Sequence, residues 1–319
     1  MTYLHPRYWL VWLGLALLRG ITFLPWRAQM ALGKALGKVF YALLKKRRNI
    51  CCINLELAFP ELSPSEREQL NRQHFISLAQ GFFEAAMSWW STEKTLKPLL
   101  HTEGESFLAD AFNSGKPIIL LSAHFTSLEL GGRLLTLQQP NIPLHVVYRP
   151  HQNKLIESQI AKIRTKRYGK AIPKLQIREM IKSLKGGFPL WYAQDQSYMG
   201  KNSVVVPFFG VPTATNSATS RFAAISGATV IPFFTVRISD SGNGKDKGKE
   251  RGYLLKFLPP IDNFPSDNIE QDTLRINQLI ESQIKEFPEQ YLWTHKRFKT
   301  KDKDFYQHYS EDNPETKCQ

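Results

Sequence analysis

The sequence predicts an α/β fold in which a mixed or mostly parallel central sheet is flanked by helices and preceded by an N-terminal membrane helix. Three features of the 319-residue chain favour this fold: an apolar N-terminal segment, helical spacing of apolar residues through the first third, and short apolar runs that afterwards alternate with helical stretches. We expect two parts, a membrane anchor over residues 1–27 and one large domain over residues 28–319.

The N-terminal segment is apolar or glycine from Tyr8 to Leu18 and, after Arg19, apolar again up to Trp26. The first run is too short to cross a bilayer, which takes about 20 apolar residues; both runs together are just long enough, provided that Arg19 reaches the interface or faces protein. We expect a helix that spans the membrane or lies in its interface. A cleaved signal peptide is the alternative, although no clear small-residue cleavage site follows Leu18.

Two helices are expected before the sheet begins. Apolar residues recur at helical spacing from Ala28 to Leu44 and again from Ser63 to Trp90. The second segment follows the breaker sequence PELSPSE, in which Ser63 and Ser65 are natural N-terminal caps.

Short unbroken apolar runs predict the strands of a buried sheet. They are Pro117–Ala123, Leu144–Tyr148, Phe188–Ala193, Thr229–Val236 and Tyr253–Leu258. Helical stretches lie between several of them, as in a largely parallel sheet. The polar segment from Ser239 to Gly252 predicts a hairpin or a flexible loop, and not a domain linker.

The chain is basic, with 42 Lys and Arg against 28 Asp and Glu and a formal net charge of +14. Nucleic acid, anionic lipid and an acidic carrier protein would each suit this charge, but no recognised nucleic-acid-binding motif is present. Several cations follow the apolar segment and, by the positive-inside rule, place the body of the chain in the cytoplasm. They are Lys34, Lys38, Lys45, Lys46, Arg47 and Arg48. A solvated basic helix face would give the same pattern.

The most informative stretch is SAHFTSLELGG, in which a strand delivers His124 to a turn, and Thr126 or Ser127 starts a helix. Ligands of α/β folds bind at this carboxyl end of a strand. With His124 in the turn, the Glu129 carboxylate can reach back to the imidazole, orient it and fix its tautomer, so that the other ring nitrogen removes a proton from a hydroxyl. Alternatively, Thr126 and Glu129 form a capping box and His124 is a structural residue.

Other common chemistries lack their signature residues. HExxH, GxSxG, a Walker loop and GxGxxG are all absent. Ser122 and Ser127 lack the context of a nucleophile elbow, and the spacing of His145 and His151 matches no metal site. We therefore expect neither a metal nor an organic cofactor.

Further segments then appear in the order of one enzyme family. They are HPRYWL (His5 to Leu10), YRP (Tyr148 to Pro150), DQSYMG (Asp195 to Gly200), PFFG (Pro207 to Gly210), SRFAAISGA (Ser220 to Ala228) and PEQYLWTHKRFK (Pro288 to Lys299). With HFTSLELGG, they make nearly the whole chain resemble the late acyltransferases of lipid A biosynthesis, the lauroyl and myristoyl transferase family. That family shares an H-x4-E or H-x4-D dyad with glycerolipid acyltransferases. Ser197 departs from the family, whose members often carry Asp or His there.

The resemblance implies a glycerolipid-acyltransferase-like fold and an acyltransferase domain over residues 28–319. The enzyme would move a fatty acyl chain from acyl carrier protein to a hydroxyl of a Kdo-bearing lipid A precursor, the secondary acylation of lipopolysaccharide biosynthesis, with His124 and Glu129 as the catalytic pair. It would work at the bacterial inner membrane, with the catalytic domain on the cytoplasmic side. Its partners would be acyl carrier protein, an anionic phosphorylated glycolipid and inner-membrane lipids, and no nucleic acid.

Four further residues take roles from the resemblance. Arg149, Arg178 and Arg221 match positive positions of the family motifs and are candidates to clamp phosphates or to stabilise an oxyanion. Asp195 is a candidate to orient one of these arginines or a sugar hydroxyl. Surface or salt-bridging arginines are the alternative. The same dyad would also serve acylation of another glycolipid or a lysophospholipid, and a basic membrane-tethered binding protein would share the charge.

Overall fold

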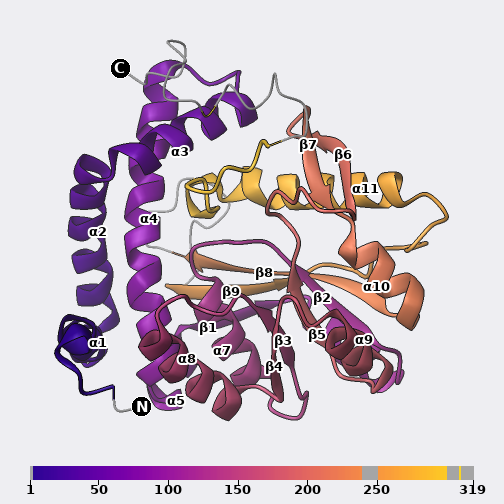
Figure 1. The fold of residues 1–319 in the computed structure, drawn as a ribbon, viewed down its shortest axis with the longest axis horizontal. Helices are drawn as coiled ribbons and strands as arrows, with labels where there is room; N and C mark the ends of the chain where they lie inside the picture. Colours follow the sequence, from indigo (N-terminus) through magenta and orange to yellow (C-terminus); the bar gives the residue numbers. More distant parts are fainter. Residues whose placement is uncertain (1–2, 239–250, 300–308, 310–319) are drawn as a thin grey trace.

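The computed structural model describes residues 3–238, 251–299 and 309. Its centre is a seven-stranded sheet in the order β1-β9-β8-β2-β5-β3-β4 (Figure 1). The strands are β1 (Leu100–Glu103), β2 (Ile118–Ser122), β3 (His145–Tyr148), β4 (Lys170–Pro173), β5 (Leu190–Ala193), β8 (Thr229–Ile238) and β9 (Gly252–Phe257). All neighbours pair in parallel except β8 and β9. The predicted mixed, mostly parallel sheet is confirmed.

Helices cover both faces of the sheet, and a further group of helices stands beside it. They are α1 (Trp9–Ile21), α2 (Trp26–Leu43), α3 (Lys45–Ala58), α4 (Pro64–Trp90), α5 (Glu93–Leu96), α6 (Ser106–Asn113), α7 (Leu128–Gln138), α8 (Lys154–Arg167), α9 (Ile177–Lys185), α10 (Ala218–Ser226) and α11 (Ile269–Glu286), with 3-10 turns η1 (Pro6–Tyr8), η2 (Lys97–Leu99) and η3 (Pro288–Gln290). In Figure 1, α1 to α4 stand on the left of the sheet, and α9 and α10 lie on the right. Ser63 caps α4 through a capping box with Glu66, as the sequence predicted for Ser63.

The core consists of two layers because alternate residues of each strand face opposite sides of the sheet. In β2, Ile119 and Leu121 pack into the layer that includes Ile276 of α11, while Ile118 and Leu120 pack into the layer that includes Leu130 of α7. All five residues of β2 are buried. A strand buried on both faces shows an unbroken apolar run, which is why this strand could be found from the sequence.

The structure also contains strands that the sequence did not predict. β1 and β4 are the two edge strands of the sheet, and the segments β6 (Ser203–Phe208) and β7 (Val211–Asn216) form a separate antiparallel hairpin. The hairpin turns at Phe209 and Gly210, which both have positive φ, as a two-residue turn of this twist requires. These strands expose polar or alternate residues and therefore lack the unbroken apolar pattern. The hairpin or loop was predicted from Ser239 to Gly252, and residues 239–250 of this segment lie outside the described residues.

Of the two placements expected for the N-terminal helix, the spanning one is not found among the described residues. The apolar segment is divided between α1 and α2 by a turn that ends at Pro25, which caps α2. Proline is unfavourable inside a helix because it lacks the amide hydrogen and clashes with the preceding turn. Within residues 3–238 and 251–299, no helix is long and apolar enough to cross a bilayer. The division into residues 1–27 and 28–319 stays a prediction.

Helix α2 crosses α4 at very close range, and two glycines allow this approach. A Cβ atom at Gly37 would lie 2.4 Å from the Cα atom of Ile76, and one at Gly33 would lie 2.6 Å from the Cγ atom of Gln80. The Gly37 neighbour is backbone, which cannot turn away as a side chain can. The crossing therefore depends on the missing side chain.

We predict that Gly37→Ala destabilises the protein by about 1–3 kcal/mol, the usual cost of overpacking. Gly14→Ala in α1 is the matched control, since in the described part of the chain no atom outside the local helix backbone lies within 4 Å of the added methyl group, and alanine is the better helix former, by up to about 1 kcal/mol. Denaturant unfolding of the three proteins measures both effects. Equal stability of the Gly37→Ala protein and the wild type would show that the two helices do not pack as described.

Candidate active site

His124 lies in the turn directly after β2, at the carboxyl edge of the parallel strands. Its backbone carbonyl accepts a hydrogen bond from the amide of Leu292 (3.0 Å), and the Thr126 amide donates to the carbonyl of Gln290 (2.8 Å). Phe125 between them pairs with Tyr291 in a short antiparallel bridge. The turn is therefore held on both sides of His124 by one C-terminal segment.

The imidazole of His124 is oriented by Asp195. Nδ1 of His124 lies 2.6 Å from Oδ1 of Asp195, and the backbone amide of His124 donates to Oδ2 of the same carboxylate at 2.9 Å. The two residues meet because β2 and β5 are parallel neighbours, with Ser122 opposite Ala193, so that each residue follows its strand by two positions. The contact fixes Nδ1 as the donor and leaves Nε2 as the free acceptor.

Burial and charge act in opposite directions on this pair. Burial disfavours the imidazolium, but the neighbouring Asp195 carboxylate outweighs it and raises the pKa of His124. For Asp195, burial alone would raise the pKa. The charge of His124 and its hydrogen bonds, with a contribution from Arg297, outweigh burial and lower the pKa of Asp195. The Asp195 side chain is 1% exposed and that of His124 is 28% exposed. Among the described residues, Nε2 of His124 has no hydrogen-bond partner, so it can receive a proton from a bound molecule.

Glu129 does not hold the His124 ring, and this part of the sequence prediction is corrected. One Glu129 oxygen accepts a hydrogen bond from Nε1 of Trp89 (3.2 Å), and the other pairs with the Arg164 guanidinium (2.9 Å). Helix α7 begins at Leu128, so Glu129 lies in its first turn and faces α4 and α8. The capping-box alternative is also wrong, because the Thr126 hydroxyl contacts the hydroxyl of Ser77 at 2.7 Å.

The three predicted arginines are placed separately on the surface. Arg149 is exposed just after β3, and Arg178 is exposed in the first turn of α9. Arg221 in α10 donates to the Ser217 hydroxyl (3.1 Å). None of the three pairs with Asp195 in the described residues, so the role predicted for Asp195 changes from orienting an arginine to orienting His124.

Sequence reasoning missed Arg164, whose guanidinium pairs with Glu129 and lies over the Tyr148 ring, 4.8 Å from its centroid. Nothing in the sequence of the basic helix α8 distinguishes Arg164 from its neighbours. The Asp195 role had a signal, because Asp195 follows an apolar strand just as His124 does. Within the described residues, no three His, Cys, Asp or Glu side chains gather as a metal site would.

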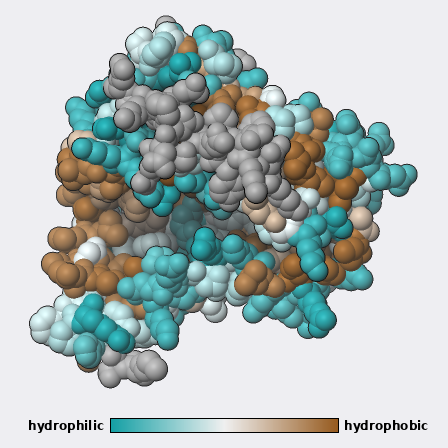
Figure 2. Space-filling view, turned by 45° about the horizontal axis from the view of Figure 1, so that its top comes forward, coloured by the Kyte–Doolittle hydropathy of each residue, from teal (hydrophilic) through white to brown (hydrophobic). Residues whose placement is uncertain are grey.

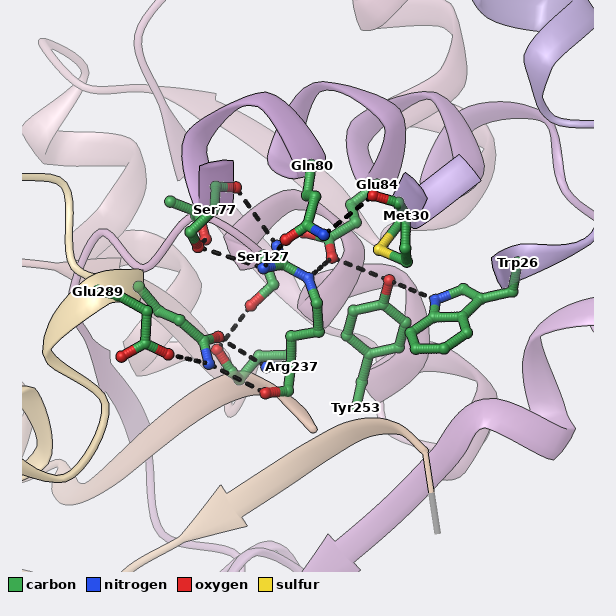
Figure 3. Close-up of polar contacts among 12 residues, drawn as sticks. Trp26, Met30, Ser77, Gln80, Glu84, Ser127, Arg237, Tyr253 and Glu289 are labelled. Carbon is green, nitrogen blue, oxygen red and sulfur yellow. Dashed lines mark hydrogen bonds and ion pairs between the residues drawn. The ribbon is translucent and has the colours of Figure 1, made fainter. Parts of the chain in front are cut away.

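A buried ion pair, whose polar contacts Figure 3 shows, supports the turn that carries His124. The Arg237 guanidinium in β8 pairs with both oxygens of Glu84 in α4 and donates to Gln80 (2.8 Å) and Ser77 (3.2 Å). Ser77 in turn contacts Thr126, two residues after His124.

The same ion pair also reaches the C-terminal segment and the N-terminal helices. The backbone of Arg237 exchanges two hydrogen bonds with the Gln290 side chain (2.7 and 2.9 Å). On the opposite side, the Tyr253 hydroxyl donates to Glu84 (2.9 Å) and accepts from Nε1 of Trp26 (3.0 Å). Sheet, α4, η3 and the start of α2 are thereby joined in one buried network.

Comparison with known proteins places the chain in a family. Residues 1–300 match the family described as bacterial lipid A biosynthesis acyltransferase. The chain is 36% identical to the lipid A biosynthesis lauroyltransferase of Escherichia coli K12, over 93% of this chain and 94% of that protein. It is 36% identical to the palmitoleoyltransferase of that organism over 94% of both chains, and 26% identical to its myristoyltransferase over 93% and 89%.

A solved structure is also similar, the 1-acyl-sn-glycerophosphate acyltransferase of Thermotoga maritima. The alignment covers 81% of this chain and 97% of that one, with 12% sequence identity and a TM-score of 0.36. This likeness is too weak to carry an argument, so the glycerolipid-acyltransferase-like character of the fold stays a prediction.

We predict that Asp195→Asn lowers the pKa of His124 relative to the wild type, because burial still opposes the imidazolium while the carboxylate charge is gone. An NMR titration of labelled histidines measures this. In the wild type, the raised pKa of His124 means that protonation adds to the free energy of unfolding. This contribution is fully present at pH values below 6.5, the ordinary pKa of histidine, and is lost as the pH rises through the raised pKa. Asp110→Asn is the control, because Asp110 is an exposed residue of α6. An unchanged His124 pKa in Asp195→Asn would contradict the pairing.

Proposed function

We propose that this chain, which belongs to the bacterial lipid A biosynthesis acyltransferase family, transfers a fatty acyl chain from acyl carrier protein to a hydroxyl of a Kdo-bearing lipid A precursor. Family membership makes the chain an acyltransferase of lipid A biosynthesis, and the alternative of a non-enzymatic binding protein is dropped. The single observation that carries the proposed mechanism is the His124 and Asp195 pair, with Nε2 of the imidazole free to accept a proton.

In the proposed reaction, the acceptor hydroxyl attacks the thioester carbonyl while its proton passes to Nε2 of His124. The tetrahedral intermediate then collapses: the C–S bond breaks, and the departing thiolate takes the proton from the imidazolium. Asp195 keeps Nδ1 protonated and stabilises the positive charge that His124 carries between these steps. The transfer consumes no metal or organic cofactor, and an acyl-enzyme intermediate is not needed.

The remaining site residues are assigned to substrate contacts. Glu129 holds Arg164 beside Tyr148 at the carboxyl edge, where a cation can neutralise an anionic acceptor. Arg149 follows β3 at the same edge and stays a candidate for oxyanion stabilisation. Arg178 and Arg221 lie in the first half of α9 and of α10, respectively. These two helices pack on the other face of the sheet, and we propose that both arginines contact phosphate groups.

We place the enzyme at the bacterial inner membrane, with the catalytic part on the cytoplasmic side. Helix α1 has no buried residue, and Leu10 and Leu17 on one of its faces are 83% and 61% exposed. Apolar side chains gather on the flank formed by the N-terminal helices, as Figure 2 shows. An amphipathic or apolar helix of this kind can lie in the membrane interface. Exposed Lys34 and Lys38 of α2 would add attraction to anionic headgroups.

An acyltransferase for another glycolipid or a lysophospholipid would use the same pair. Incubation with acyl carrier protein thioesters and each acceptor, followed by mass spectrometry of the lipid product, separates these cases. An ester formed on the Kdo-bearing precursor alone supports the proposal, and preferential acylation of lysophospholipid contradicts it.

We predict that His124→Ala, Asp195→Asn and Glu129→Gln each lower transfer by at least about a hundredfold, the usual loss of positioned acid-base catalysis or substrate contact. The pH profile distinguishes their roles. Because His124 acts as a base, activity rises as the pH passes its pKa, and Asp195→Asn moves this midpoint to lower pH. Glu129→Gln leaves the midpoint in place, since Glu129 acts through Arg164.

Steady-state rates across the pH range, with Glu103→Gln as an exposed control, measure both effects. If Glu129→Gln moved the midpoint and Asp195→Asn did not, the assignment of the orienting carboxylate would be wrong.

A second prediction concerns the membrane. Leu10→Gln combined with Leu17→Gln removes apolar contact area while the basic residues remain, so we expect binding that high salt strips off, because exposed charges are screened. Fractionation with and without salt measures the change. Leu175→Gln is the matched control, since Leu175 is 84% exposed but precedes α9 on the opposite side of the sheet (Figure 1). Retention of the double variant in high salt would contradict attachment through α1.

A further inference from the structure

A second polar site lies in a cleft between α5, α7 and α8. The cleft has a volume of about 310 Å³, within the range of small-ligand sites. Its polar walls are formed by Arg133 and Thr136 of α7, by Lys166 and Arg167 of α8, and by Glu93 of α5. It is closed by the loop that leads into β3, at the amino edge of the sheet, whereas His124 lies at the carboxyl edge.

Arg133 is the unusual residue of this cleft. Its side chain is only 7% exposed, and its contacts with Thr136 and with Glu93 are both 3.5 Å long, at the limit of a hydrogen bond. Nε of Arg133 is buried and has no partner among the described residues. A buried cation is normally paired and fully hydrogen-bonded, because desolvation without partners is costly. Arg133 lines the cleft, and with only these two long contacts its guanidinium keeps unused donor capacity.

The charges that line the cleft around Arg133 are mostly positive. Three cations and one carboxylate line the cleft, and the carboxylate of Glu93 is shared with Lys97 at 3.7 Å. Burial and the nearby Arg167 charge lower the pKa of Arg133, so its charged form lies in an unfavourable environment. The excess of two positive charges matches a dianion, and a phosphomonoester carries nearly this charge at neutral pH.

Helix dipoles account for only part of this arrangement. Lys166 and Arg167 lie in the last turn of α8, where cations stabilise a helix without any ligand. Arg133 lies in the middle of α7, where no helix terminus favours a cation. The planar guanidinium of arginine binds phosphate oxygens through paired hydrogen bonds.

We propose that the cleft between α5, α7 and α8 is an anion-binding site that takes a phosphomonoester group, with Arg133 as its floor and Lys166 and Arg167 as its walls. The phosphate can belong to a lipid headgroup or to a soluble compound. The site goes beyond the proposed acyl transfer and does not depend on it. Binding can be measured without turnover, so a failure of one proposal does not affect the other.

The first experiment measures thermal stabilisation and calorimetric binding with inorganic phosphate at constant ionic strength, with chloride as the comparison. Arg133→Met is expected to lose at least about tenfold in phosphate affinity, as removal of a charged hydrogen-bond donor would cause. Without phosphate, this variant should melt at or above the wild-type temperature, since an unfavourably buried charge has been removed. Loss of a structural ion pair would instead lower the melting temperature.

Lys166→Ala provides a second variant that should keep the fold intact, because Lys166 is exposed. It should weaken phosphate binding severalfold, whereas Lys162→Ala, one turn earlier on α8 and outside the cleft, should not. Phosphate also stabilises proteins by exclusion from their surface, and such a gain would be equal in all variants. Equal stabilisation of the wild type, Arg133→Met and Lys166→Ala would overturn the proposal.

A flotation experiment then distinguishes the sources of the phosphate. Phosphatidylcholine vesicles with and without phosphatidic acid are mixed with the full chain and its Arg133→Met and Lys166→Ala variants. Extra binding to phosphatidic acid that both variants lose, and that soluble phosphate displaces, assigns the site to a lipid headgroup. Phosphate binding that depends on Arg133, without this extra flotation, assigns it to a soluble phosphate ester.

Discussion

The buried ion pair between Arg237 and Glu84 is the interaction on which the arrangement of the domain depends. Two full charges are withdrawn from water, and the cost of desolvation is offset only because both carboxylate oxygens and the guanidinium find partners. Breaking such a pair by removing one partner commonly costs about 3–5 kcal/mol. The pair ties helix α4 to strand β8 and, through Ser77 and Gln290, sets the position of the turn that carries His124. The stability of the core and the geometry of the site therefore share one set of contacts.

The catalytic pair follows from sheet topology. Two parallel strands that are neighbours in space but distant in sequence end at the same edge, so residues two positions beyond β2 and β5 meet there. Asp195 contacts both the ring and the backbone amide of His124, which fixes the position of the ring as well as its tautomer. Glu129 lies five residues after His124, in the first turn of α7, and pairs instead with Arg164 of α8. The carboxylate that serves the imidazole is therefore the one that strand pairing brings to the same edge, and not the one nearer in sequence.

The sequence allowed the sheet and the location of the site to be predicted because both leave local patterns. Buried parallel strands such as β2 show unbroken apolar runs, and His124 follows one of them directly. Edge strands such as β1 lack that pattern. The partner of His124 could not be assigned from spacing, because strand order is set by packing across the whole chain. The break at Pro25 carried a local signal, since proline favours a helix boundary, but two apolar runs separated only by Arg19 suggested one helix across residues 8–26.

Two buried arginines illustrate how the fold handles buried charge in different ways. Arg237 has its donors satisfied by protein atoms, so its positive charge contributes to a rigid framework and leaves little capacity for a ligand. Arg133 is almost as deeply buried, yet it has two long contacts and an unpartnered Nε beside two further cations. A fold can retain such a charge when an anion from outside completes its coordination. The difference lies in the partners and not in the depth of burial, and it separates an arginine that holds helices together from one that is arranged to receive a ligand.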